Sequence, residues 1–387
     1  MIKNIAVGID VGTHTTRVVV CEFGKGDKAP RILGLGETSS RGLRKGYVTN
    51  IEEAGKSIRR AVTEAEKNSG IKIKRAYVSV GGISLESISG FGSAVVSRAD
   101  GEVTTLDVNK ALSESEDGLK IPNKKIIHVI PTIYKLDGKE VLGKPEGMKG
   151  VKLEIKTLFV TCLTQHLDDL VAAISLSGVE VIDVIASPLA TSLIVLNDKQ
   201  KTAGCILVDI GAETVSIAIF ENGAIQALHV FSIGSTDITN DIALGLKIPL
   251  EEAEGLKIGS IIRDFPKKKL DQIIEARLSD VFELIENYLK KIKRNGLLPA
   301  GVIMTGGGAN ISMIEELSRK FLQLPSKLGT AEILNGTKSK LRDSSWFVAL
   351  GLSMAQRGQT ENYSGSVGSG LRSVRNFFKS ITNQLLP

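Results

Sequence analysis

The stretch that decides the fold is residues 4–23, NIAVGIDVGTHTTRVVVCEF, in which two apolar runs flank the turn Asp10-Val11-Gly12-Thr13. Apolar runs on both sides of a glycine-containing turn predict two strands joined by a tight connection. A second copy occupies residues 205–221, CILVDIGAETVSIAIFE, with Asp209-Ile210-Gly211-Ala212 at its turn. Two matching units in one chain predict an internal duplication in which the same turn is used twice.

The segments around both units follow one order of strands and helices. In the first half, apolar periodicity predicts strands and helices at residues 31–37, 50–69, 74–82, 157–163, 165–177 and 179–187. In the second half it predicts strands at 224–231 and 301–307, helical segments after Ser235, and a helix over 309–321. The chain is therefore expected to be an α/β protein.

Two segments interrupt this order, and the composition changes near the end of the chain. Residues 83–156 carry their own strand patterns and a polar helical stretch at 107–118, which predicts an inserted subdomain. Small and polar residues in QRGQTENYSGSVGSG predict a flexible linker. The predicted divisions are 1–82 with 157–190, 83–156, 191–230 with 299–355, a mainly helical 231–298, 356–370 and 371–387.

Composition excludes several classes of function. The chain has 387 residues, a formal net charge of +6 and 4% aromatic residues, and we expect no nucleic-acid partner because stacking side chains are scarce. Cys21, Cys162 and Cys205 lie far apart without metal-ligand spacing, which is typical of a cytosolic, reduced protein. No apolar run is long enough for a spanning helix, and Asp10 interrupts the N-terminal run too early for a signal peptide.

The paired turns carry groups that suit phosphate and magnesium. Backbone N–H groups and a threonine hydroxyl at such a turn can cradle phosphate oxygens, and an adjacent carboxylate suits Mg²⁺ held through water. A third element, Met304-Thr305-Gly306-Gly307-Gly308-Ala309, favours a close backbone approach to a flat group, with an ordinary helix-entry loop as the alternative. A Walker loop is excluded, because Asn50 stands where the only Gly-Lys-Ser, at residues 55–57, would need its first glycine.

In this order, the motifs resemble the actin, heat-shock chaperone and sugar kinase superfamily, and within it the FtsA family of bacterial cell-division proteins. The stretches that carry the resemblance are VGIDVGTHTTRVVV (7–20), VSVGGISLESISGFG (78–92), LVDIGAETVSIAIF (207–220) and VIMTGGGA (302–309). The resemblance implies an actin-like fold. Two duplicated ribonuclease-H-type domains would surround a nucleotide cleft, with two inserted subdomains and a C-terminal amphipathic helix.

The resemblance also implies ATP and Mg²⁺ as ligands and assigns residues to them. Phosphate contacts are implied for Gly12, Thr13, His14, Thr15, Gly211, Ala212 and Glu213. Asp10 and Asp209 would approach Mg²⁺ through water, and Gly306, Gly307, Gly308, Glu254 and Lys257 would contact the nucleoside, although Glu254 and Lys257 also fit a surface ion pair. Ala186-Ser187-Pro188-Leu189-Ala190 stands where actin places a water-orienting glutamine, so we expect at most slow ATP hydrolysis.

The last residues have the pattern of an interfacial membrane helix. An apolar stripe with flanking cations and no acids predicts attachment to an anionic membrane surface, with a helix docked on its own domain as the alternative. The residues concerned are Leu371, Arg372, Val374, Arg375, Phe377, Phe378, Lys379, Ile381 and Leu385.

Basic residues also gather in the helical segment 231–298. Arg277, Lys291 and Arg294 are expected on the side of a helix opposite its apolar face, and a solvated basic face is the simpler interpretation. The resemblance implies that this surface receives the acidic C-terminal tail of FtsZ, the tubulin-like division protein. It further implies a self-assembling scaffold at the division septum, on the cytoplasmic side of the inner membrane, that recruits later division proteins. A metabolic kinase of the same superfamily and an actin-like pilus-assembly protein are the alternatives.

Overall fold

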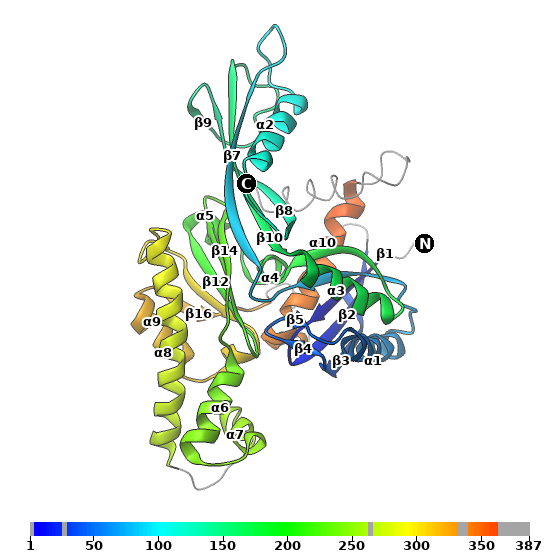
Figure 1. Ribbon diagram of the computed structural model, residues 1–387, viewed down its shortest axis with the longest axis vertical. Helices are drawn as coiled ribbons and strands as arrows, with labels where there is room; N and C mark the ends of the chain where they lie inside the picture. The colour runs from blue at the N-terminus through cyan, green and yellow to red at the C-terminus, as the bar shows by residue number, and fades with distance from the viewer. Residues whose placement is uncertain (1–3, 25–28, 262–265, 332–339, 363–387) are drawn as a thin grey trace.

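Two five-stranded sheets with the same strand order lie at the centre of the computed structural model, which describes residues 4–24, 29–261, 266–331 and 340–362 (Figure 1). The first sheet has the order β3-β2-β1-β6-β11 and the second β14-β13-β12-β15-β16. In each, the first three strands are antiparallel and the last two run parallel to the central one. The shared order confirms the predicted duplication and the actin-like α/β fold. The strands are β1 (Asn4–Val11), β2 (Thr15–Phe23), β3 (Arg31–Ser39), β6 (Arg75–Val80), β11 (Glu180–Ala186), β12 (Cys205–Ile210), β13 (Val215–Glu221), β14 (Ala224–Phe231), β15 (Gly301–Thr305) and β16 (Ser326–Leu328).

Helix α1 (Ile51–Ser69) covers the first sheet. The sequence provides a capping residue at each end of this helix and a glycine on the strand that it contacts. The Asn50 side chain accepts a hydrogen bond from Glu53 N at 3.0 Å, and Gly70 ends the helix with a φ of 69°. In β3, a Cβ added at Gly36 would lie 1.9 Å from Ala61 O, so glycine lets the helix backbone lie directly on the strand.

The C-terminal helix returns to the first half. Helix α10 (Phe347–Asn362) packs on β1, where a Cβ at Gly8 would lie 2.2 Å from Ala349 O. The predicted linker at 356–370 therefore begins too early, because residues 356–362 continue the helix without a proline or a glycine pair to stop it. The predicted amphipathic helix at 371–387 lies outside the described residues. The other helices of this half are α3 (Thr164–Leu176) and α4 (Ser187–Val195), whereas the short helix α5 (Asp198–Ala203) packs on β13 and β14 of the second sheet.

Helices form most of the segment between the strands of the second half. Helix α8 is the long helix at the lower left of Figure 1, and its predicted apolar face is buried at Leu278, Val281, Phe282, Ile285 and Leu289. The helix predicted at 309–321 begins later, since residues 307–310 form a 3₁₀ turn. The helices are α6 (Ser235–Leu246), α7 (Leu250–Lys257), α8 (Lys267–Lys291) and α9 (Ile314–Leu322).

The insertion forms a separate sheet of order β7-β10-β8-β9, with α2 (Thr105–Asp117) along one face, at the top of Figure 1. Strand β10 runs past the predicted boundary at residue 156 and pairs with β8 as far as Leu163. Residues 157–163 therefore belong to this sheet and not to the first half. Leu158, Val160 and Cys162 are buried against the main core, which gives the strand an apolar run that fits either sheet. The strands are β7 (Glu86–Val95), β8 (Lys124–Leu136), β9 (Lys139–Val141) and β10 (Lys152–Leu163).

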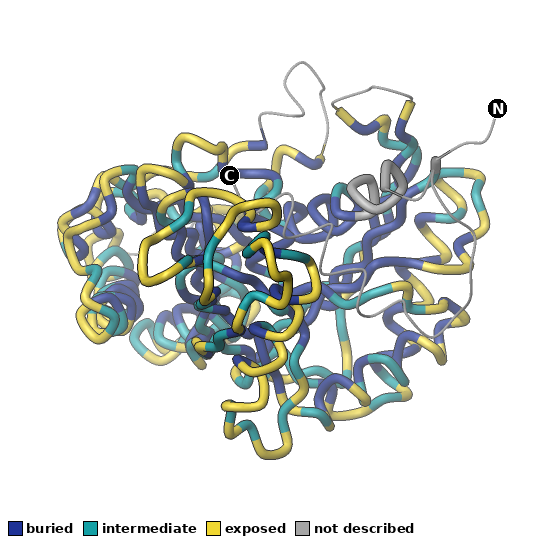
Figure 2. The backbone as a smooth tube through the Cα atoms, turned by 90° about the horizontal axis from the view of Figure 1, so that it is seen from above, coloured by how far each residue is buried: buried dark blue, intermediate teal, exposed yellow. Residues whose placement is uncertain are grey.

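Burial follows this layering. Figure 2 shows buried backbone through the interior and exposed segments on the outside. One apolar core joins the first half, the base of the insert and one face of the second sheet, and another lies between the second sheet and its helices. Across residues 4–24, 29–261, 266–331 and 340–362, no helix has the length and apolar character needed to cross a membrane.

Candidate functional site

The turns after β1 and β12 line one cavity of about 320 Å³ together with the glycine-rich loop after β15. The cavity is thus shared by the two duplicated halves. All but one of the ligand-binding residues predicted from the sequence line it: Asp10, Gly12, Thr13, His14, Thr15, Asp209, Gly211, Ala212, Glu254, Lys257, Gly306, Gly307 and Gly308.

Glu213 is the predicted residue that the structure places elsewhere. Its carboxylate accepts a hydrogen bond from the Lys45 N–H at 2.5 Å, in the hairpin formed by β4 (Leu43–Arg44) and β5 (Tyr47–Val48). The side chain of Glu213 is therefore directed to the first half of the molecule, and the phosphate contact implied for this residue stays a prediction. The contact with Lys45 ties the second turn to the first half of the molecule.

The first turn is held by its neighbours. Gly12 is required because a Cβ there would lie 2.7 Å from Thr15 O, and its carbonyl accepts a hydrogen bond from Ser40 Oγ at 2.7 Å. The Thr13 hydroxyl accepts from Gly46 N at 3.0 Å. Its own proton remains available to an oxygen in the cavity.

The second turn is fixed to the start of α6. Gly211 N donates to Thr214 O at 2.9 Å, which closes the turn. Ser235 N donates to Gly211 O at 2.9 Å, and Thr236 N donates to Ala212 O at 2.8 Å. Movement of the helical segment that begins at α6 must therefore move this turn as well.

Asp10 and Asp209 place two carboxylates in a buried part of the cavity. Asp10 accepts a hydrogen bond from Ser79 Oγ at 2.7 Å, and burial raises its pKa against the opposing effects of Ser79 and Arg17. Burial and the neighbouring charge of Asp10 raise the pKa of Asp209 to about 7. A divalent cation between the two carboxylates would offset both the burial of their negative charges and the repulsion between them. The described residues contain no group of three or more His, Cys, Asp or Glu that could hold a metal, so water and phosphate would have to complete its shell.

The three consecutive glycines after β15 differ in what they require. Gly306 has a φ of 88°, and a Cβ there would lie 2.3 Å from Asp209 Oδ1. A Cβ at Gly308 would lie 2.4 Å from Ile210 Cγ2. At Gly307 a Cβ would meet no protein atom within 4 Å, although the residue lines the cavity. Protein packing thus accounts for glycine at residues 306 and 308. It does not account for glycine at residue 307, which borders open space in the cavity.

Glu254 and Lys257 do more than form a surface ion pair. Lys257 Nζ lies 2.7 Å from Glu254 Oε2, 2.8 Å from Thr239 Oγ1 and 3.1 Å from Ser235 O, and the lysine side chain is only 7% exposed. Both residues line the cavity. The ammonium group is therefore held in place at the edge of the cavity, between α6 and α7.

Sequence reasoning missed several polar residues that line the cavity, and two of them, Arg17 and Ser345, have buried polar atoms without a hydrogen-bond partner. Arg17 lies between Glu37, at 2.9 Å, and the ring of Trp346, at 5.5 Å, and its buried Nε has no hydrogen-bond partner. An arginine within the apolar strand TTRVVVCEF was the signal that could have identified it. The buried Ser345 Oγ also lacks a partner and lines the cavity. No sequence motif marks Ser345.

The start of α4 offers neither an amide nor a carboxylate to orient an attacking water. Ser187 lines the cavity, but Ala186, Pro188, Leu189 and Ala190 carry no amide or carboxylate. The described residues that line the cavity include no Asn or Gln, and their only acids are Asp10, Asp209 and Glu254.

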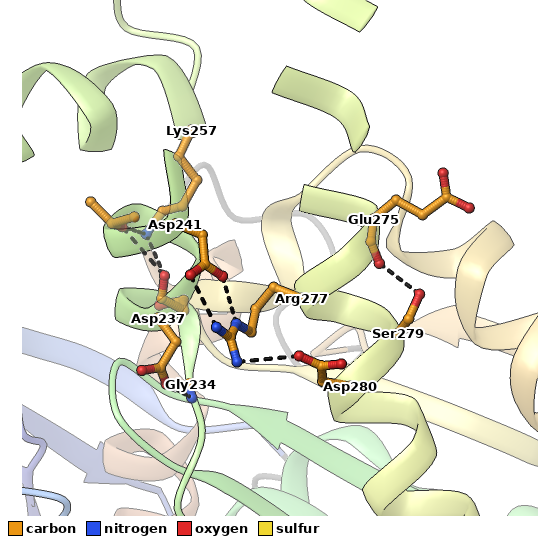
Figure 3. A network of polar contacts seen from close by, with 10 residues as sticks. Gly234, Asp237, Asp241, Lys257, Glu275, Arg277, Ser279 and Asp280 are labelled. Atoms are coloured by element: carbon orange, nitrogen blue, oxygen red, sulfur yellow. Dashed lines mark hydrogen bonds and ion pairs between the residues drawn. The ribbon is translucent and has the colours of Figure 1, made fainter. Parts of the chain in front are cut away.

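The three cations predicted to form one docking face do not lie together. Arg277 points toward α6 and donates to Asp241 at 2.6 and 3.0 Å and to Asp280 at 3.2 Å, as Figure 3 shows. Arg294 lies beyond the end of α8 and pairs with Glu221 at 2.5 Å. Lys291 is exposed, but at 1.5 Å per residue it is about 20 Å along the helix from Arg277. A single basic face formed by all three is therefore wrong, because two of them pair with acids of the same chain.

Two sheets of identical order, with paired Asp-x-Gly turns facing one cavity, define a protein of the actin-like class. A solved PilM-PilN type IV pilus biogenesis complex superposes with a TM-score of 0.65 at 16% identity, covering 91% of this chain and 98% of that one. MreB5 of Spiroplasma citri bound to ADP superposes with a TM-score of 0.55 at 14% identity, covering 94% and 99%.

Family models narrow this class. Residues 206–351 match the model of cell division protein FtsA, and residues 84–161 match the SHS2 domain inserted in FTSA. Cell division protein FtsA of Pseudomonas aeruginosa is 32% identical over 371 residues, covering 90% of this chain and 88% of that protein. The chain belongs to the FtsA family of cell division proteins. This membership sets aside the metabolic kinase and pilus-assembly alternatives.

Proposed function

We propose that the cavity between the two halves binds ATP with Mg²⁺. The observation that carries the proposal is the pairing of Asp10 with Asp209 beside two phosphate-type turns, in a cavity that also contains the orphaned polar atoms of Arg17 and Ser345. The similar fold of MreB5, solved with bound ADP, supports a nucleotide at this place.

The residues present fit such a ligand. The turns at Gly12 and Gly211 would hold phosphate oxygens through backbone N–H groups, and Lys257 would supply a fixed positive charge. Bound Mg²⁺ would neutralise phosphate charge and the two buried carboxylates. Gly307 would let the flat part of the nucleotide approach the backbone closely.

ATP acts in this proposal as a conformational ligand more than as a substrate. The cavity lacks an amide or a carboxylate at the start of α4, so no side chain there orients a water for attack on the γ-phosphate. Turnover should be slow, and the energy of binding is available to favour one arrangement of the two halves. We propose that this arrangement self-assembles into filaments.

We further propose that the helical segment receives the acidic C-terminal tail of FtsZ at its far tip. Lys267, Lys268 and Lys269 are exposed in the first turn of α8, where the helix dipole is already positive, so an acidic ligand there relieves an unfavourable charge arrangement. A Cβ at Gly245 of α6 would lie 2.6 Å from Ile273 Cδ1 of α8, and the adjacent Leu244 is 78% exposed. Cationic and apolar groups together suit an acidic tail with apolar side chains.

The proposed scaffold attaches to the membrane through residues 371–387, which lie outside the described part of the chain. Each fully buried large apolar side chain contributes at most about 1.5–3 kcal/mol, and ordering the tail offsets much of this, so one tail should bind reversibly. Several tails on one filament would bind more firmly through effective concentration. The chain would then anchor FtsZ filaments to the inner face of the cytoplasmic membrane at the septum and recruit later division proteins.

Titration calorimetry of the full chain with ATP tests the nucleotide part of this proposal. We expect saturable binding that weakens at least tenfold when Mg²⁺ is removed or when Asp10 is replaced by Asn. The variant Asp198→Asn, which changes an exposed acid at the start of α5, is the matched control and should bind as the wild type does. Magnesium-independent binding, or equal affinity of the Asp10→Asn variant, would contradict the proposed site.

A further inference from the structure

Strand β7 leaves one of its edges without a neighbouring strand. It is the first strand in the sheet order β7-β10-β8-β9 and pairs with β10 without a bulge from Glu86 to Val95. Near its beginning, Ser87 Oγ accepts from Leu228 N at 2.7 Å and donates to Leu228 O at 3.2 Å, which fixes this end to β14. From Ser89 to Val95 no described strand pairs with the outer edge.

The backbone groups on this edge can be assigned from one contact. Ser93 N donates to Glu114 Oε2 at 2.6 Å, so Ser93 turns its backbone away from β10. In an antiparallel ladder, alternate residues direct both backbone groups to the same side. Ser89, Phe91 and Val95 therefore face the open edge together with Ser93. Apart from the Ser93 N–H, which is already bonded to Glu114, this row of backbone groups is a template for an added strand.

Two large apolar side chains are exposed beside the edge, on a face that they share with Ser89 and Ser93. Phe91 and Val95 are both 72% exposed and lie on the face opposite α2. Phe91 lines a groove of about 330 Å³ together with Ile133 and the charged residues Glu114, Lys135, Glu154 and Lys156. Two large exposed apolar side chains on a free edge are unusual, because natural proteins protect such edges with charges or prolines.

The other face of the edge is acidic. Gly92 brings α2 directly onto β7, since a Cβ there would lie 2.0 Å from Ala111 O. Glu114, Glu116 and Asp117 are exposed on this fully described helix, against Lys110 as its one exposed cation. The Glu114 carboxylate reaches the edge itself. A cationic side chain on an added strand would find its partner there.

We propose that the edge of β7 from Ser89 to Val95 docks an extended segment of a partner protein that alternates apolar residues with Lys or Arg. The apolar residues meet Phe91 and Val95, and the basic residues meet Glu114 on the side of α2. A second copy of this chain is a poor occupant, because antiparallel pairing about Ser93 would bring two Glu114 carboxylates together. The site is separate from the nucleotide cavity and does not depend on its occupancy.

The test uses fluorescein-labelled peptides and fluorescence anisotropy with the full chain. We expect the peptide KVKVKVKVK to bind at least tenfold more tightly than EVEVEVEVE, and N-methylation of its alternate amides to abolish binding. Phe91→Lys should lower the affinity at least tenfold, and Glu114→Gln about threefold. Leu142→Lys, which changes a side chain 90% exposed on the same insert, is the matched control and should bind as the wild type does.

Three results would overturn the assignment. Equal binding of the two peptides would show that charge does not select the partner. Unchanged affinity of the Phe91→Lys variant would show that the peptide does not bind at the edge of β7. Self-association of the wild type that Phe91→Lys abolishes would make a second copy the occupant. Thermal unfolding of each variant shows that the insert remains folded, and ATP titration of the Phe91→Lys variant keeps this test distinct from that of the nucleotide site.

Discussion

Replacing Gly307 by alanine separates ligand binding from folding more cleanly than any other change in the cavity. A Cβ at this residue meets no protein atom within 4 Å, and its φ is not in the left-handed region. The substitution should therefore leave folding intact, and the reduced freedom of the unfolded chain should stabilise the protein by about 0.4–1 kcal/mol. The new methyl group projects into space that the bound nucleotide would occupy.

The expected cost to ATP binding is at least tenfold in Kd, or about 1.4 kcal/mol, because a nucleotide packed on the backbone must shift to accommodate a methyl group. Titration calorimetry measures this loss, and thermal unfolding without nucleotide measures stability. The matched control is Gly118→Ala in the distant insert, where the φ is −73° and the nearest atom to a Cβ lies at 3.8 Å. An unchanged ATP affinity for the Gly307→Ala variant would refute the nucleoside assignment of this loop.

Three further predictions concern charged groups. Lys257→Met should weaken ATP binding about tenfold and lower the free energy of unfolding by about 1–3 kcal/mol, because the ammonium group lies within 3.1 Å of three oxygens. Glu254→Gln should have a smaller effect on both quantities. Titration calorimetry and thermal unfolding measure both variants. Asp209 has a folded pKa of about 7 against an unfolded value of about 3.9, so the folded state holds the extra proton and its stability falls as the pH rises from 4 to 7. Without nucleotide, Asp209→Asn should raise the melting temperature more at pH 8 than at pH 4, and an equal change at both would contradict this. Lys268→Glu should weaken binding of an acidic FtsZ tail peptide without changing the melting temperature, whereas Arg277→Glu should lower the melting temperature by breaking the contact with Asp241.

The strands and turns of the cavity could be predicted from the sequence because their signals are local. Apolar runs around Asp10-Val11-Gly12 and Asp209-Ile210-Gly211 define both the strand pairs and the turn between them. The repetition of this unit then predicts that the two turns face one ligand. These local signals predicted the strand pairs, the duplication and the two turns, whereas the actin-like arrangement and the roles of Glu254 and Lys257 were implied by the family resemblance.

Contacts between distant segments could not be predicted in this way. Glu213 meets Lys45 across 168 residues, and Arg277 meets Asp241 across 36, so neither partner lies within any local pattern. The strand β10 illustrates a different limit. Its last residues are buried on both faces, and a continuous apolar run does not reveal which sheet the strand joins.

Co-sedimentation with lipid vesicles tests whether this chain links FtsZ to the membrane under the control of ATP, because it involves the cavity, the helical tip and the tail in one measurement. The full-length chain is mixed with anionic vesicles, Mg²⁺ and a labelled FtsZ tail peptide and is centrifuged with and without ATP. The control is a chain truncated after Asn362, where α10 ends. We expect the peptide to pellet with the vesicles only when the full-length chain is present, and to a greater extent with ATP. Peptide that stays in the supernatant, or that pellets equally with the truncated chain, would contradict this expectation.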